Sequence, residues 1–190
     1  MKKICLLLLL ALFTIQTFAQ TREDTTGWRF HDDLLDNLVG QWYGTSIVHG
    51  GSFTLNFDAK WVLNHQYVRV RFKSREVVPW LKIPFEEDLF LGYNHTTKRY
   101  VAHEMTVHGS DGLYEGFSYA YRTGNEIKLV KKVGANPDTL NLQRFIWEPA
   151  THAWQMTSGL LIAGKEGEPF VDMKLIAVKP LSKKKKSLSK

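Results

Sequence analysis

The sequence predicts an all-β protein, an antiparallel up-and-down barrel of roughly ten strands with one short N-terminal helix. From Gln41 onward, short runs of β-branched and aromatic residues alternate with turn residues at roughly ten-residue spacing, which is typical of sandwiches and barrels. No long helical period separates these runs, so a parallel sheet with crossover helices is not expected. Hairpin-linked strands leave two open edges unless the sheet closes, and closure makes a barrel the preferred form.

The chain begins with the pattern of a secretory signal peptide. Two lysines precede an apolar run from Ile4 to Phe13, and small residues lead to a cleavage point after Ala19. The run is short for a membrane-spanning helix, which needs about 20 apolar residues. We therefore expect an exported protein, periplasmic or secreted, that loses residues 1–19. Cys5 is the one cysteine of the chain, so the mature protein is expected to lack disulfides and thiolates.

One short helix is expected within His31–Val39. Asp32 and Asp33 favour its start, because acidic side chains stabilise a helix N-terminus, and Gly40 favours its end. The helix has one apolar face, formed by Leu34, Leu35 and Leu38.

Ten strands are expected after the helix, each joined to the next by a short connection. Their expected ranges are 41–48, 52–63, 66–74, 88–93, 99–107, 113–121, 126–132, 140–147, 154–162 and 170–178. The connections contain Gly, Asn, Asp or Pro where the chain must reverse, and the longest runs from Pro79 to Glu87. Short connections predict that consecutive strands are neighbours in the sheet.

The hairpin around Asn64-His65 distinguishes the inner face of the sheet from the outer one. If these two residues form the turn, Val62 faces Tyr67 and Asp58 faces Arg71. The apolar face must then point inward; its members are Phe53, Leu55, Phe57, Trp61, Leu63, Val68, Val70 and Phe72. The outer face carries Asp58, Lys60, Arg69, Arg71 and Lys73, with Asp58 and Arg71 expected as a cross-strand ion pair.

The formal net charge of +6 comes from basic residues at the two ends of the chain, outside the predicted barrel. Eight of the 25 lysines and arginines fall in residues 1–19 and 179–190, so the residues between carry 17 basic and 19 acidic side chains, or −2. A nucleic-acid-binding surface is therefore not expected. We divide the mature chain into a flexible segment, 20–30, the barrel, 31–180, and a lysine-rich tail, 181–190. The tail is either disordered and solubilising, or it touches anionic surfaces weakly.

Three stretches resemble one group of proteins. Residues 38–44, Leu-Val-Gly-Gln-Trp-Tyr-Gly, resemble the Gly-x-Trp opening of the calycin superfamily, in which the tryptophan plugs the barrel base. Residues 61–67 and 91–100 are similar to two hairpin signatures of bacterial lipocalin-like domains of unknown function, although Asn94 stands where those domains usually have Asp. The resemblance covers residues 34–178. It implies a lipocalin-like barrel with Gly40 and Trp42 at its base, and no particular activity, because that family has no agreed one.

The same opening more distantly resembles the haem-binding nitrobindins, ten-stranded calycins that ligate iron through a histidine late in the chain. The last expected strand, 170–178, contains no histidine. Haem would need His103 or an unusual ligand such as Met173, so no cofactor is expected. No spacing of histidines or cysteines matches a zinc site, so no metal is expected either.

His103 is the main candidate for chemistry. On a regular strand it shares a face with Val101, Met105 and Val107, and this face is expected to point inward. A histidine there can bind a ligand or act as a general base, or it can be a hydrogen-bonded core residue. Glu104 then points outward, which argues against a His103–Glu104 pair.

The other candidate ligand-binding residues are Phe117, Tyr119, Arg144, Met156 and Met173. Arg144 would meet an anionic headgroup if it pointed inward, and an outward position stays open. The first functional hypothesis is a barrel that binds a small apolar or amphipathic ligand. The alternatives are a calycin-type enzyme that uses His103 as acid or base, and a structural or envelope-interaction barrel with a filled interior. An interior without about 300 Å³ of space would exclude small-molecule binding.

Overall fold

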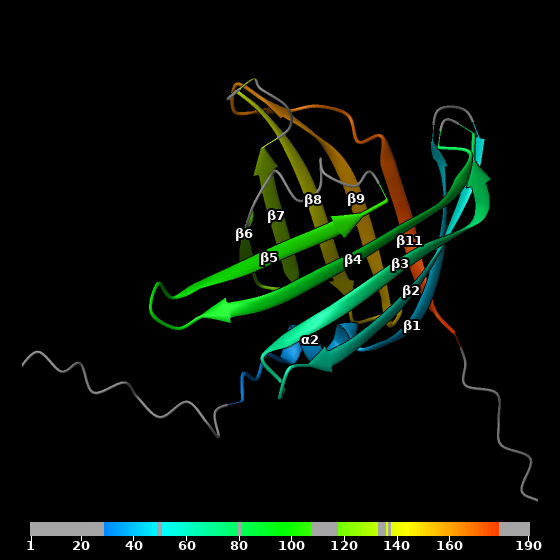
Figure 1. Cartoon of the computed structure of the whole chain (residues 1–190). Coiled ribbons are helices and arrows are strands. Elements are labelled where there is room, and N and C mark those ends of the chain that lie inside the picture. Colours follow the sequence, from blue (N-terminus) through cyan, green and yellow to red (C-terminus); the bar gives the residue numbers. More distant parts are fainter. Residues whose placement is uncertain are drawn as a thin grey trace, which may run out of the picture.

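A computed structural model describes residues 29–48, 51–79, 81–107, 118–132, 136 and 138–178 of the chain. These residues form one short helix and a β-barrel (Figure 1). The helix is α2 (Asp33–Leu38). The strands are β1 (Gly40–Val48), β2 (Gly51–Val62), β3 (Tyr67–Val78), β4 (Ile83–Asn94), β5 (Arg99–Thr106), β6 (Ser118–Thr123), β7 (Glu126–Lys132), β8 (Thr139–Glu148), β9 (Ala153–Ile162), β10 (Lys165–Glu166) and β11 (Val171–Ala177). The expected signal peptide and lysine-rich tail lie outside the described residues.

The sheet closes on itself. Each strand from β1 to β9 pairs with the next one in antiparallel fashion, and β11 pairs with both β9 and β1. Among the described residues, ten strands therefore form a ring, and the two-residue β10 pairs with β9 alongside it. A ring of strands has no unpaired edge. For the described part of the chain, the predicted ten-stranded antiparallel barrel with one short helix is confirmed.

The β2–β3 hairpin has the predicted register, with Val62 opposite Tyr67 and Asp58 opposite Arg71. Its apolar face points inward, except that Leu63 lies in the turn with 67% of its surface exposed. The predicted ion pair between Asp58 and Arg71 is wrong, because Arg71 forms its salt bridge with Glu86 on β4 at 3.1 Å. The ion pairs of this outer face join β3 to β4 in the described structure.

The strands β3 and β4 extend beyond their predicted ends. The expected loop from Pro79 to Glu87 is mostly strand, because a bulge lets β3 and β4 resume pairing at Val78 and Ile83. The Ser74 hydroxyl accepts the Phe85 N–H at 2.8 Å, which satisfies a backbone donor inside the bulge. This extension brings Phe85 and Glu87 onto the wall of the barrel.

Helix α2 lies across one opening of the barrel (Figure 1). Asp32 caps it, since one carboxylate oxygen accepts the Leu35 N–H at 2.8 Å. All three leucines of its apolar face are buried in the core. Trp42 lies inside the same end of the barrel and donates its indole N–H to the Leu38 carbonyl at 2.8 Å. Gly40, at φ +145°, makes the turn from helix to strand, a conformation that L side chains rarely adopt.

Candidate functional site

The two ends of the barrel differ in the chemistry of their half-buried inward side chains. Next to α2 the interior is filled by fully buried side chains such as Val68, Leu91, Trp154 and Leu175, and the half-buried inward residues packed against this core are aromatic: Trp61, Tyr93, Tyr100 and Trp147. At the opposite end, the inward positions include several that are only half-buried, namely Phe53, Phe85, Glu87, Lys131, Asn141, Leu160 and Val171. Solvent therefore reaches the inner wall at this end, which we call the open end.

The open end has a polar wall and an apolar wall. The polar wall is formed by inward side chains of β4 to β9: Glu87, Glu104, Ser118, Lys131, Asn141, Gln143 and Ser158. The apolar wall is formed by Phe53, Phe85, Leu160 and Val171. The rings of Phe53 and Phe85 meet edge to face with 6.3 Å between their centroids. The two walls together suit a molecule with one polar and one apolar part.

Three side chains of the polar wall form an ionisable cluster, which we call the trio: Glu87, Glu104 and Lys131. Glu104 is 7% exposed, and the Lys131 ammonium donates a hydrogen bond to its carboxylate. The Oε1 atom of Glu87 is buried and has no hydrogen-bond partner in the described part of the chain. Such an atom is costly to bury without a partner.

The environment of Glu87 changes its protonation. Burial raises the pKa of its carboxyl from 4.5 to about 8, the negative charge of Glu104 adds to this rise, and Lys131 opposes it. At neutral pH Glu87 is therefore mostly protonated. Because Glu104 and Lys131 form an ion pair, the trio carries close to no net charge in that state.

The alternation of β4 places Glu87 on the inner wall. Leu89 and Leu91 are buried inward residues of the same strand, and Glu87 lies two positions before Leu89. Leu89 is opposite Glu104 on β5. Glu87 is not among the residues predicted from the sequence, because the acidic pair Glu86-Glu87 lies in the stretch expected to be a loop. Extending the Leu89–Leu91 alternation backward by one step would have revealed it.

The predicted orientation of β5 is wrong. Ala102 and Glu104 are the buried residues of this strand, whereas Val101, His103 and Met105 lie on its outer face. The inward orientation follows from pairing, because Ala102 lies opposite Leu91 and Glu104 opposite Leu89. His103 therefore does not face the interior, and the predicted outward position of Glu104 is reversed.

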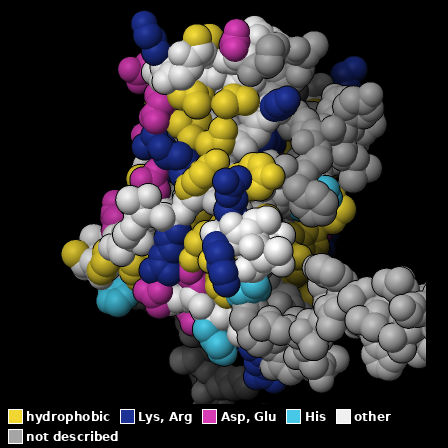
Figure 2. Space-filling model, turned by 90° about the vertical axis from the view of Figure 1, so that its left-hand side faces the viewer, with side chains coloured by type: hydrophobic (Ala, Val, Ile, Leu, Met, Phe, Trp, Pro, Cys, Tyr) yellow, Lys and Arg dark blue, Asp and Glu magenta, His cyan; other side chains and the backbone are white. Residues whose placement is uncertain are grey.

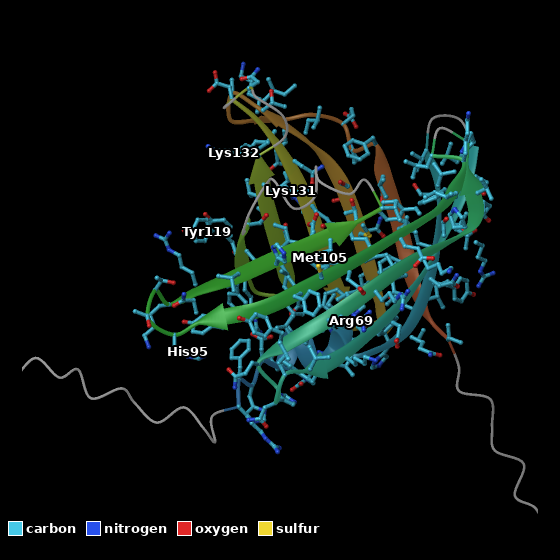
Figure 3. The ribbon with its side chains drawn as sticks, viewed as in Figure 1. Arg69, His95, Met105, Tyr119, Lys131 and Lys132 are labelled. Carbon is cyan, nitrogen blue, oxygen red and sulfur yellow. The ribbon has the colours of Figure 1, made fainter. Side chains whose placement is uncertain are left out.

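The outer face of β5 and β6 is unusually apolar, which explains the error. Met105 and Tyr121 are both exposed there, and Figure 2 shows hydrophobic side chains on this side of the barrel with lysines and arginines among them. Tyr119 (Figure 3) also points outward with 49% of its surface exposed. The Arg99 guanidinium lies 5.4 Å from the centroid of its ring. The expected inward position of Tyr119 is therefore wrong. Phe117 lies outside the described residues.

Arg144 also lies on the outer face, which excludes it from a headgroup site inside the barrel. Its guanidinium forms ion pairs with Glu126, at 3.5 Å, and with Glu166 on β10. The inward residues of the same strand are Gln143 and Phe145. The outward alternative left open by the sequence is the observed one.

Met156 and Met173 point inward, on the neighbouring strands β9 and β11, and lie opposite each other. Both are buried in the core together with Phe145. Met156 lies two residues before Ser158 of the polar wall, and Met173 two residues after Val171 of the apolar wall. The two methionines therefore form part of the floor beneath the open end.

A second buried polar cluster ties α2 to the barrel. The Asp32 carboxylate accepts hydrogen bonds from the Tyr100 hydroxyl and, at 2.7 Å, from the Arg122 guanidinium. Arg122 also pairs with Asp33 at 2.8 Å. Burial, together with Asp32, raises the pKa of Tyr100 to about 12. These groups satisfy one another, so we assign the cluster a structural role.

A groove of about 360 Å³ lies on the outer face of β1 to β3. Its lining includes Arg71, Lys73 and Arg75. The first two form ion pairs with Glu86, and Arg75 donates hydrogen bonds to the Asn56 side chain. Because these cations already have partners, the groove is a weaker candidate than the open end.

The described residues show neither a cluster of metal ligands nor a helix that could span a membrane. No group of three or more His, Cys, Asp or Glu side chains there is arranged to hold a metal ion. Within the same residues, no helix has the length and apolar character needed to cross a membrane.

The fold and the site define the protein as a closed ten-stranded antiparallel β-barrel, compatible with a lipocalin-like fold, that has an ionisable cluster inside one end. No protein-family model matches the chain, and no curated protein matches it either.

Proposed function

We propose that the protein is an exported, lipocalin-like barrel of calycin type that binds a small amphipathic molecule at its open end. The carrying observation is the buried Oε1 atom of Glu87, which has no hydrogen-bond partner among the described residues and belongs to a solvent-accessible wall. A bound polar group that reaches this atom would offset its burial cost. The half-buried rings of Phe53 and Phe85 offer contact area for an apolar part.

The filled half of the barrel limits what the open end can take. The methionine floor and the fully buried side chains next to α2 fill the interior up to the open end, where the inner wall of mixed polarity is half-buried. A ligand would therefore insert from that end, with its polar group beside the trio and its apolar part against the apolar wall. Export rests on the N-terminal sequence pattern, and weak contact of the lysine-rich tail with anionic surfaces remains part of this proposal.

Fluorescence of N-phenyl-1-naphthylamine, a dye that brightens in apolar pockets, tests the binding site. Replacing Leu160, on the apolar wall, with Trp should fill the open end and weaken dye binding at least about tenfold. Tyr119→Trp is the matched control, because Tyr119 is exposed on the outer face, and it should bind the dye like the wild type. Equal binding by both variants would place the dye elsewhere, and absence of binding by the wild type would remove the proposal.

One observation favours an enzyme as the second candidate function. The trio contains two carboxyls in different environments, a mostly protonated Glu87 and a Glu104 that is ion-paired with Lys131. Such pairs often supply a general acid and a general base. This moves the acid–base candidate from His103 to Glu87. Native mass spectrometry of protein purified from its own host would identify a bound molecule, and its chemical conversion on incubation would favour the enzyme.

A further inference from the structure

The trio at the open end has one carboxyl more than it has cations. Lys131 pairs with Glu104. The charges of Glu104, on β5, and of Lys131, on β7, both act on the carboxyl of Glu87. Its neighbour Asp88 lies on the outer face, where it forms a salt bridge with Arg69 at 2.8 Å, and Phe72 lies opposite Glu87 on β3. Within the described residues, the Glu87 Oε1 atom has no hydrogen-bond partner, and Lys131 is the cation whose charge acts on this carboxyl.

We propose that the molecule held at the open end carries an ammonium group, such as that of a primary amine attached to an apolar chain, and that this group binds between Glu87 and Glu104. The inference rests on the proposed function and names its ligand class. An uncompensated charge is strongly unfavourable in a buried site, so the charges of the trio and of its ligand should balance.

The three common headgroups leave different charges in the trio. A ligand carboxylate would place a second negative charge beside that of Glu104, whereas Lys131 supplies one positive charge. A hydroxyl would leave the charges unchanged and gain one hydrogen bond with protonated Glu87. An ammonium lets Glu87 ionise, so that two carboxylates face two cations. This last arrangement adds a charge-assisted hydrogen bond, which is stronger than one between neutral groups.

Binding of an ammonium is coupled to proton release. The ligand nitrogen donates an N–H to the Glu87 carboxylate, and the proton that Glu87 held leaves to solvent. Because burial raises the pKa of Glu87 to about 8 in the free protein, most of one proton should be released per ligand at pH 7. The affinity for the ammonium should then rise by up to about tenfold per pH unit between pH 6 and pH 8.

Isothermal titration calorimetry with three probes of equal chain length tests the inference: decylamine, 1-decanol and decanoate. Titrations at pH 7 in two buffers of different ionisation enthalpy measure the proton release. We expect decylamine to bind at least about ten times more tightly than either other probe and to release close to one proton. Equal or tighter binding of decanol or decanoate, or decylamine binding without proton release, would overturn the ammonium assignment and leave the binding barrel standing. Failure of all three probes to bind would refute the proposed function itself.

Two substitutions on neighbouring positions of β4 locate the effect. Glu87→Gln keeps the shape of the side chain and removes its proton equilibrium, so it should lower decylamine affinity at least about tenfold, abolish proton release and leave decanol affinity unchanged. Glu86→Gln is the control, because Glu86 lies on the outer face with Arg71 and Lys73 and should change none of the three affinities. An unchanged decylamine affinity in Glu87→Gln would contradict the proposal.

Discussion

At the scale of single residues, the two interior carboxyls at the open end, Glu87 and Glu104, differ in their environments and in their protonation. Glu104 has Lys131 as its cation and sits in a buried ion pair. Glu87 has no such cation among the described residues, so burial keeps its proton on. Ionising a buried carboxyl costs free energy in the folded state, so the free energy of unfolding depends on pH.

Glu87 should make the protein less stable as pH rises. Its pKa is 4.5 in an unfolded chain and about 8 in the folded one, so folding takes up a proton between these values. Its contribution is complete below about pH 4.5 and is lost as pH rises through about 8. Glu87→Gln should match the wild type near pH 4.5 and exceed it in free energy of unfolding at pH 9 by several kcal/mol.

Urea denaturation of both proteins from pH 4.5 to pH 9 measures this difference. The other shifted carboxyls, Asp33, Glu76, Glu86 and Glu148, have lowered pKa values, so their effects appear as pH falls below their ordinary values. The lowered pKa of His95, caused by burial, acts with the opposite sign to Glu87, below about pH 6.5. Parallel curves for the wild type and Glu87→Gln would show that Glu87 does not titrate as described.

At the scale of elements, α2 depends on one buried carboxylate. Asp32 caps the helix and accepts hydrogen bonds from Tyr100 on β5 and Arg122 on β6. A six-residue helix is too short to be stable alone, so these bonds and the three buried leucines hold it on the barrel.

Asp32→Ala should therefore destabilise the protein by about 2–4 kcal/mol, because it removes the cap and a partner of the partly buried Arg122. Asp33→Ala is the matched control, since Asp33 contacts the same arginine from an 83% exposed position. Its urea midpoint should stay close to that of the wild type. If both variants lose stability equally, the cap and the buried contacts of Asp32 do not hold α2 in place.

The elements also show which parts of the fold could be predicted from the sequence. The β2–β3 register was predictable because one face is apolar and the other charged, so that a one-residue shift would bury Arg69 and Arg71. The orientation of β5 was not, because its outer face carries Val101 and Met105 while its inner face carries Glu104. Polarity indicates the inner face only where the interior is apolar, and at the open end it is not.

At the scale of the whole molecule, the closed ring has one end that α2 lies across and one open end. The ring closes where β11 pairs with both β9 and β1. The leucines of α2 and the side chain of Trp42 fill the end of the barrel next to α2. The opposite end keeps half-buried walls of mixed polarity. The candidate site therefore depends on closure, because its two walls come from strands that only the closed ring brings together.

Gly44 tests closure directly, because β1 and β11 approach closely there. A Cβ atom at this position would lie 2.9 Å from the Lys174 carbonyl oxygen and 2.8 Å from a Leu175 methyl, so Gly44→Ala must push the two strands apart. We expect a loss of about 1–3 kcal/mol, seen as a Tm lower by several degrees in thermal unfolding followed by circular dichroism. Gly51→Ala is the control, since its Cβ would meet nothing closer than 3.7 Å, and its Tm should stay near that of the wild type. Equal Tm values for the two variants would mean that β1 and β11 do not meet at Gly44, and the ring that creates the open end would lose its support.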